Sequence, residues 1–226
     1  MRARVGGWPF LKICGLRTEY EARAALAAGA TALGMLVGLT HRAEDEATEA
    51  EARQLVSALG SGARLVLVTH LIDPGAIADL ARRIGVSTIQ VHGDVPPEGL
   101  RALRILAPDA CLIKAIHVTG LDAVARAKAF APLADALLLD SRTADRLGGT
   151  GRTHDWNISR RIVDAVAPVP VILAGGLTPD SVVAATEQVR PAGVDVNSGV
   201  EDPTGAKDSV RMRAFITAAL SAFRAA

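Results

Sequence analysis

LLLDSRTADRLGGTGRTHDW, residues Leu137–Trp156, is the segment that decides the fold. Its apolar run ends at Asp140, a polar loop closes on the glycine-rich stretch Gly148–Gly151, and a helix is predicted to begin near Asp155. A strand, a carboxylate, a glycine-rich loop and a helix in this order are typical of parallel α/β folds, where ligands bind beyond the carboxyl ends of the strands. Glycines there let backbone N–H groups approach an anion. Taken alone, the segment equally allows Asp140 to cap a turn and the glycines to serve only a loop.

The rest of the chain repeats the same unit. Eight short apolar runs predict strands at Leu11–Cys14, Ala32–Val37, Arg64–Thr69, Thr88–His92, Cys111–His117, Ala136–Asp140, Val171–Ala174 and Gly193–Asn197. Stretches rich in Ala, Arg and Glu predict helices at Glu19–Ala28, Glu49–Leu59, Pro74–Ile84, Pro97–Leu106, Leu121–Phe130, Asn157–Val166, Ser181–Gln188 and Ala206–Arg224. Strict alternation predicts parallel strands joined by helical crossovers.

Eight successive strand–helix units favour a (β/α)8 barrel, also called a TIM barrel, over the alternative of an open doubly wound sheet. No linker or change of composition divides the chain, so we expect a single domain over residues 1–226, with residues 1–10 as a short N-terminal extension. Half of the 226 residues are hydrophobic and only 3% are aromatic, which predicts a sizeable aliphatic core.

Charge and composition weigh against several classes of protein. The formal net charge is +1, and no basic stripe is interleaved with aromatic residues, so nucleic-acid binding has little support. No apolar run reaches the length of a membrane span, about 18 residues, and MRARVGGWPF at residues 1–10 lacks the apolar core of a secretion signal. Cys14 and Cys111 have no metal or disulfide spacing, so we expect reduced thiols, a cytoplasmic protein and no metal requirement.

Polar side chains interrupt several predicted strands near their carboxyl ends. Pairs two residues apart lie on one face of a strand, and buried polar groups are costly unless they are paired. The sequence therefore predicts a polar cup, lined by Cys14, His92, Asp140, Asp195 and Asn197. Two alternatives stay open here: Lys12 and Asp195 could form a buried ion pair, and Cys14 could be a small buried hydrophobic residue, as we expect for Cys111.

The loops after the last two predicted strands read AGGLTPDS and NSGVED. In barrels these two loops often form a phosphate site, since small residues expose their N–H groups and Ser198 adds a hydroxyl donor. With the glycine-rich loop of residues 148–151, three such loops follow strands of one barrel, and together they predict a phosphate site.

Seven motifs, in order along the chain, resemble the phosphoribosylanthranilate isomerase family of tryptophan biosynthesis. They are KICG at Lys12–Gly15, QVHG at Gln90–Gly93, LLLDS at Leu137–Ser141, GGTG at Gly148–Gly151, DW at Asp155–Trp156, AGGL at Ala174–Leu177 and DVNSGVE at Asp195–Glu201. The resemblance implies a (β/α)8 barrel that isomerises a phosphorylated sugar substrate without a cofactor.

The resemblance also implies roles for individual residues. Cys14 corresponds to the general base of the family, Asp140 to the general acid, and Arg42 to the arginine that contacts the anthranilate carboxylate. The remaining positions assigned to substrate binding are His92, Asp195 and Asn197, and those assigned to phosphate are Gly149, Gly151, Gly176, Ser198 and Gly199. An acid that opens the sugar ring and a base that removes the adjacent proton are what an Amadori rearrangement needs. A thiol is mostly protonated at neutral pH, so the surroundings of Cys14 must stabilise its thiolate if it is to act as a base.

The chain departs from the family pattern on the side of the substrate's amine. The departures are Thr40 and His41 before Arg42, the acidic stretch Glu44–Glu46, Thr69, His70 and Asn197. Alternatives to the isomerase are a paralogue acting on another phosphorylated substrate, a sugar-phosphate-binding barrel without catalysis, and a Schiff-base aldolase. The last needs Lys114 to point into the cup with a lowered pKa. We expect a monomer or a homodimer.

Overall fold

Eight parallel strands form a closed barrel in the computed structural model, which describes residues 9–40, 45–143, 146–147 and 154–225. In order around the barrel the strands are β1 (Phe10–Ile13), β2 (Ala32–Leu36), β3 (Leu65–Thr69), β4 (Thr88–Val91), β5 (Cys111–His117), β6 (Ala136–Asp140), β9 (Val171–Leu173) and β10 (Gly193–Val196). β10 pairs with β1 and closes the ring. The prediction of a (β/α)8 barrel is confirmed.

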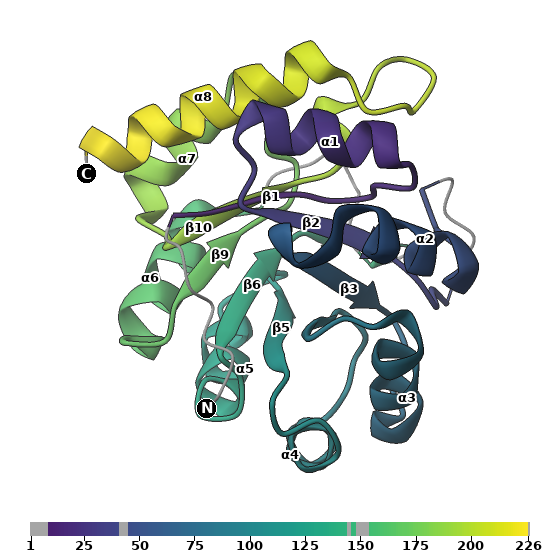
Figure 1. Ribbon diagram of the computed structural model, residues 1–226. Coiled ribbons are helices and arrows are strands. Elements are labelled where there is room, and N and C mark those ends of the chain that lie inside the picture. Colours follow the sequence, from purple (N-terminus) through teal and green to yellow (C-terminus); the bar gives the residue numbers. More distant parts are fainter. Residues whose placement is uncertain (1–8, 41–44, 144–145, 148–153, 226) are drawn as a thin grey trace.

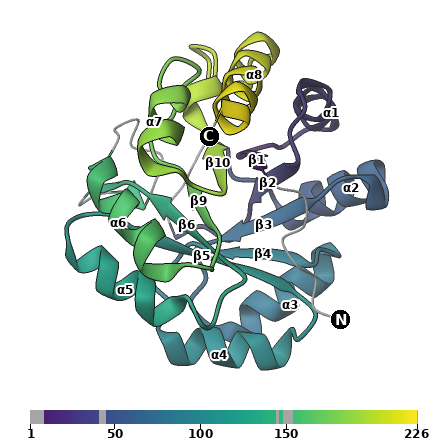
Figure 2. The ribbon, with the colours of Figure 1, turned by 90° about the vertical axis from the view of Figure 1, so that its left-hand side faces the viewer.

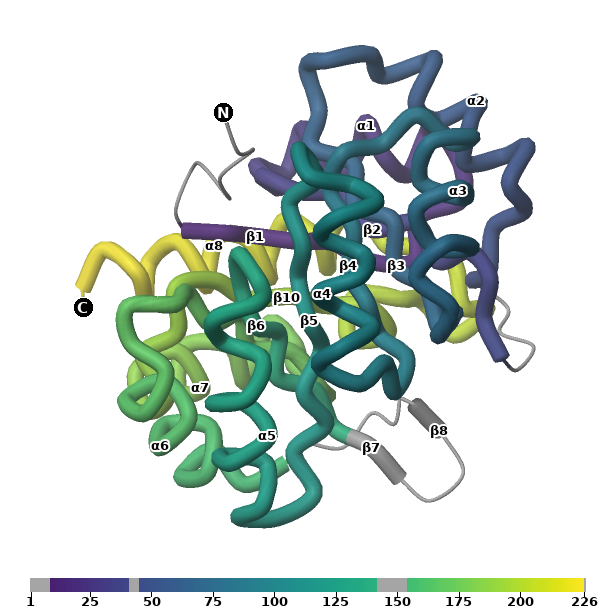
Figure 3. The backbone as a smooth tube through the Cα atoms, turned by 90° about the horizontal axis from the view of Figure 1, so that it is seen from below, coloured from purple at the N-terminus to yellow at the C-terminus, as the bar shows by residue number. Residues whose placement is uncertain are grey.

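Helices surround the strands on the outside of the barrel (Figures 1 and 2). They are α1 (Glu19–Ala28), α2 (Glu49–Leu59), α3 (Pro74–Ile84), α4 (Pro97–Leu106), α5 (Asp122–Phe130), α6 (Trp156–Val166), α7 (Val182–Val189) and α8 (Ser209–Ala225). α8 returns along β1 and packs beside α1, so the last helix lies against the first strand and the first helix (Figures 1 and 3). None of the described helices is long and apolar enough to cross a bilayer.

Local signals explain where helices begin. Thr18 caps α1 by accepting a hydrogen bond from the backbone N–H of Glu21, whose carboxylate accepts from the N–H of Thr18 in return. Thr48 and Glu51 form the same reciprocal pair at α2. Asp73 caps α3. Such caps satisfy N–H groups that have no partner within the helix, which is why these starts can be read from the sequence.

The strands present two different faces to two cores. Inward-facing residues fill the barrel with mostly small and aliphatic side chains: Phe10, Ala32, Val66, Val68, Cys111, Ile113, Ala115, Ala136, Leu138 and Ile172. The alternate residues face the helices and pack in a larger aliphatic layer. Alternation along each strand therefore separates a filled barrel interior from the helix layer, and leaves the carboxyl ends of the strands for polar residues.

The structure adds elements that the sequence did not predict. A short antiparallel pair, β7 (Arg142–Thr143) and β8 (Arg146–Leu147), follows β6. The described ranges also contain two 3₁₀ turns, η1 (Gly60–Gly62) and η2 (Ser198–Val200), and the last helix begins at Ser209 rather than Ala206. Phe10, predicted as part of the extension, is the first residue of β1. The division into one domain over residues 1–226 and an extension stays a prediction, because residues 1–8 lie outside the described ranges.

Candidate active site

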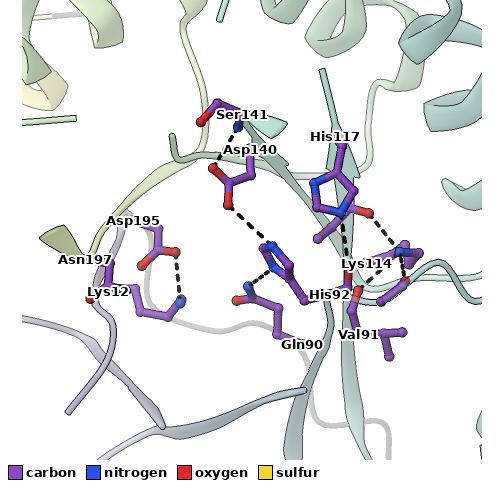
Figure 4. A network of polar contacts seen from close by, with 12 residues as sticks. Lys12, Gln90, Val91, His92, Lys114, His117, Asp140, Ser141, Asp195 and Asn197 are labelled. Carbon is purple, nitrogen blue, oxygen red and sulfur yellow. Dashed lines mark hydrogen bonds and ion pairs between the residues drawn. The ribbon is translucent and has the colours of Figure 1, made fainter. Parts of the chain in front are cut away.

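Polar side chains gather where the strands β1, β4, β6 and β10 end. Cys14 follows β1, His92 follows β4, Asp140 is the last residue of β6, and Asp195 lies in β10. Figure 4 shows the side chains of Asp140, His92, Asp195 and Lys12 facing a common space. Because the eight barrel strands are parallel, their carboxyl ends meet at one mouth of the barrel, and residues far apart in the sequence become neighbours there.

Asp140 is held as an acid at the edge of this space. Its carboxylate accepts a hydrogen bond from the backbone N–H of Ser141 at 2.7 Å, yet the side chain is almost completely buried. Burial, reinforced by the nearby carboxylate of Asp195, raises the pKa of Asp140 to about 7. A carboxyl group with this pKa is about half protonated at neutral pH and can donate a proton there.

His92 lies beside Asp140 as a neutral ring. Its Nε2 is 3.5 Å from Oδ2 of Asp140. Burial, assisted by His117 and His70, lowers the pKa of His92 well below its usual value, so the contact is not an ion pair. The amide nitrogen of Gln90 lies 3.2 Å from Nδ1 of His92. When that amide donates to Nδ1, the ring proton lies on Nε2 and points at Asp140.

Two further histidines extend this cluster. The ring of His70 stacks on His92 with centroids 5.4 Å apart, and the ring of His117 meets His92 edge-on at 5.0 Å. Nε2 of His117 is 3.1 Å from the carbonyl oxygen of His92. No motif in the sequence assigns a site role to His117. Its position as the last residue of β5 was the available signal, since Asp140 ends β6 in the same way.

A buried ion pair lies beside Cys14. Nζ of Lys12 is 2.9 Å from Oδ2 of Asp195, which confirms the pairing that the sequence left open. Burial disfavours the charged form of Lys12, but the charges of Asp195 and Cys14 outweigh that effect and raise its pKa. Burial also raises the pKa of the Cys14 thiol to about 11; Lys12 acts against this rise, whereas Asp195 and Asp45 add to it.

Asn197 takes part in a different network. Its side-chain nitrogen donates to Asp45 at 2.6 Å, and its side-chain oxygen accepts from the ammonium of Lys207. Lys207 also pairs with Glu201. The amide of Asn197 thus joins the segment after β2 to the segment before α8, and its polar atoms are engaged with protein partners.

The two loops predicted to bind phosphate lie against each other. Gly199, in η2 after β10, approaches so closely that a Cβ there would collide with the carbonyl oxygen of Leu177, in the loop after β9. That packing brings Ser198 and Gly199 next to the loop that contains Gly176, which adopts a positive φ of 67°. Gly149, Gly151 and Arg42 lie outside the described residues.

Lys114 does not point into the cup. Its Nζ donates to the carbonyl oxygens of Val91, Gly93 and Ala115 at 3.3, 2.9 and 2.8 Å. It also lies 5.4 Å from the centre of the Phe130 ring on α5. Burial lowers the pKa of Lys114 to about 8, but the side chain occupies the layer between β5 and the helices. The geometry that a Schiff-base aldolase requires is absent at this lysine. Among the described residues, no group of three or more His, Cys, Asp and Glu side chains could hold a metal ion.

The sequence model of one protein family matches residues 11–218, and that family is described as N-(5'phosphoribosyl)anthranilate (PRA) isomerase. The chain belongs to this family. The N-(5'-phosphoribosyl)anthranilate isomerases of Methanocella arvoryzae and Haloferax volcanii are each 42% identical to it, over 207 and 212 residues. These alignments cover 91% and 94% of this chain, and 95% and 93% of the relatives.

Solved structures of the family have the same fold. The phosphoribosylanthranilate isomerase of Thermotoga maritima superposes with a TM-score of 0.82 at 31% identity, covering 93% of this chain and 98% of that one. A phosphoribosylanthranilate isomerase in complex with reduced 1-(o-carboxyphenylamino)-1-deoxyribulose 5-phosphate superposes with a TM-score of 0.79 at 29% identity, with the same coverage. Fold and family therefore agree with the motifs, and the resemblance read from the sequence is confirmed.

Proposed function

We propose that this chain catalyses the cofactor-free Amadori rearrangement of N-(5'-phosphoribosyl)anthranilate to the corresponding 1-amino-ketose, a step of tryptophan biosynthesis. The observation that carries the proposal is the position of Asp140 and Cys14. They lie at the ends of β6 and β1, which are separated in the barrel by β9 and β10. The loops after those two strands carry the phosphate-binding candidates, so a phosphate held there leaves the sugar between acid and base.

In the first step, protonated Asp140 gives its proton to the ring oxygen of the ribose. The bond between that oxygen and the anomeric carbon breaks, and the nitrogen lone pair forms the C=N bond of a Schiff base. The raised pKa of Asp140 suits this step, because a carboxyl group with an ordinary pKa would be almost fully ionised at neutral pH.

In the second step, the thiolate of Cys14 removes the proton from C2, and the electron pair moves toward nitrogen to give an enolamine. Transfer of the C2 hydroxyl proton to Asp140, and of the thiol proton to C1, gives the ketone and restores both groups. Each group gives up one proton and takes one back over the cycle, so no external acid, base or oxidant is consumed.

The remaining assignments concern binding. Gly149, Gly151, Gly176, Ser198 and Gly199 bind the phosphate through N–H and hydroxyl donors. Arg42 pairs with the anthranilate carboxylate, and His92 and Asp195 face the sugar. Asn197 acts indirectly, by holding the segment after β2 through Asp45. A crystal grown in phosphate tests the first assignment: an ion is expected between Gly176 and Ser198, and an empty pocket contradicts it.

The function is tested with the purified protein and N-(5'-phosphoribosyl)anthranilate, by following conversion to the amino-ketose. Expression in a tryptophan auxotroph that lacks this isomerase should restore growth. Absence of both conversion and growth, with a correctly folded protein, would contradict the proposal. A cytoplasmic location and a monomeric or homodimeric state stay predictions; size-exclusion chromatography with light scattering measures the second.

A further inference from the structure

Lys12 and Cys14 share one small space beside β2. Lys12 lies in β1 and Cys14 follows directly after it, two residues further along the extended chain, so their side chains lie on the same face. A Cβ added to Gly34, on the neighbouring strand β2, would lie 2.7 Å from Sγ of Cys14 and 3.2 Å from Nζ of Lys12. The missing side chain at Gly34 thus leaves the room in which the sulfur and the ammonium group approach each other.

The ammonium of Lys12 lies near two acidic groups in this space, the carboxylate of Asp195 and the thiol of Cys14. Its side chain is fully buried, and its Nζ is 2.9 Å from the carboxylate of Asp195 on β10. Water screens charges weakly in such a place, so a cation beside a thiol favours the thiolate strongly. The carboxylate of Asp195 has the opposite effect, because it neutralises the same cation and repels a second negative charge.

We propose that the Lys12–Asp195 pair sets the thiolate population of Cys14, with Lys12 increasing it and Asp195 limiting it. In this role both are positioning residues, since their effect is exerted through Cys14. The inference rests on the proposed function, in which Cys14 is the base. Three charged groups act on the thiol: Lys12 on β1, Asp195 on β10 and Asp45 in the segment after β2. Lys12 is the main group that lowers the pKa of Cys14, and Asp195 raises it more than Asp45 does.

Opposite changes in the two variants distinguish this role from a structural one. Lys12→Met should decrease the thiolate fraction of Cys14, whereas Asp195→Asn should increase it. A nearby charge shifts a pKa by about 1–3 units. One unit changes the thiolate fraction about tenfold, but the thiolate of lower pKa is a weaker nucleophile, so the net change in alkylation rate is about threefold per unit.

The experiment measures the rate of alkylation of Cys14 by iodoacetamide between pH 7 and 10, in a Cys111→Ala background. Mass spectrometry identifies the modified residue, and circular dichroism checks the fold. At pH 8, Lys12→Met should react at least threefold more slowly than the parent and Asp195→Asn at least threefold faster. Lys114→Met, which also removes a buried lysine but one outside the cup, is the matched control and should leave the rate unchanged.

Changes in the same direction in both variants, or no change in either, overturn the inference. If Lys12→Met does not fold, Asp195→Asn still tests the sign, and Lys12→Arg should keep the parent rate because it keeps the cation. The readout is independent of turnover. Full activity of Cys14→Ser would therefore remove the proposed base without affecting this result, whereas unchanged alkylation rates would remove the inference alone.

Discussion

The pH dependence of kcat/KM follows from the two raised pKa values at the site. Asp140 must be protonated to act as the acid, and its pKa is about 7. Cys14 must be ionised to act as the base, and its pKa is about 11. The group that must be ionised, Cys14, therefore has the higher pKa. Only a minor fraction of the enzyme carries a protonated Asp140 and an ionised Cys14 at the same time.

The shape of the profile can be worked out from these values. Below pH 7 the thiolate fraction rises about tenfold per pH unit while Asp140 stays protonated, so kcat/KM rises with a slope near one. Between about pH 7 and 11 the gain in thiolate cancels the loss of protonated Asp140, and kcat/KM is level. On this plateau about one enzyme molecule in 10⁴ has both groups in the active state, the ratio set by a difference of about four pKa units.

Steady-state kinetics from pH 5.5 to 9.5 test this reasoning, and Asp140→Asn supplies the decisive comparison. The variant should lose about 10²–10⁴-fold in turnover at pH 7. Its residual activity should keep rising through pH 7 with the thiolate, without the break of the parent enzyme. A break near pH 7 that persists in Asp140→Asn comes from another group, such as the substrate phosphate. A parent profile that falls above pH 7 contradicts the high pKa of Cys14.

Three further substitutions give distinct outcomes. Cys14→Ser should fold normally by circular dichroism and lose about 10²–10⁴-fold in kcat; turnover equal to that of the parent would end the assignment of Cys14 as the base. In the double variant with Asp140→Asn the two losses should not multiply, because the two groups act as a unit. Arg42→Ala should mainly raise KM for the anthranilate-bearing substrate, since uniform binding is lost; an unchanged KM would point to a different amine part of the substrate. Gly175→Ala should lower both kcat and Tm, because Gly175 has a φ of 84° and a Cβ there would lie 2.6 Å from the backbone nitrogen of Ser141 and 2.9 Å from Oδ1 of Asp140. Gly60→Ala, with a φ of 57° and open space around it, is its matched control and should keep kcat; equal losses in both variants would assign the effect to backbone strain alone.

The sequence by itself determined the order and nature of the elements. Apolar runs, helix caps such as Thr18 with Glu21, and prolines at helix starts are local signals, and a helix start needs only residues within one turn to be satisfied. The alternation of eight strands with eight helices then left few topologies, because parallel strands need crossovers. The motifs also placed Cys14, His92 and Asp140 at strand ends, because each of these residues closes a short apolar run in the sequence.

Only the tertiary structure decided what these residues can do. The pKa of Asp140 depends on burial and on Asp195, which comes from another strand, and the pKa of Cys14 depends on Lys12, Asp195 and Asp45. Closure of the barrel sets those distances, and no short window of sequence contains them. The tertiary structure also decided which way the side chain of Lys114 points. On a strand buried on both faces a polar residue can face the barrel interior or the helices, and only the register of β5 decides between the two.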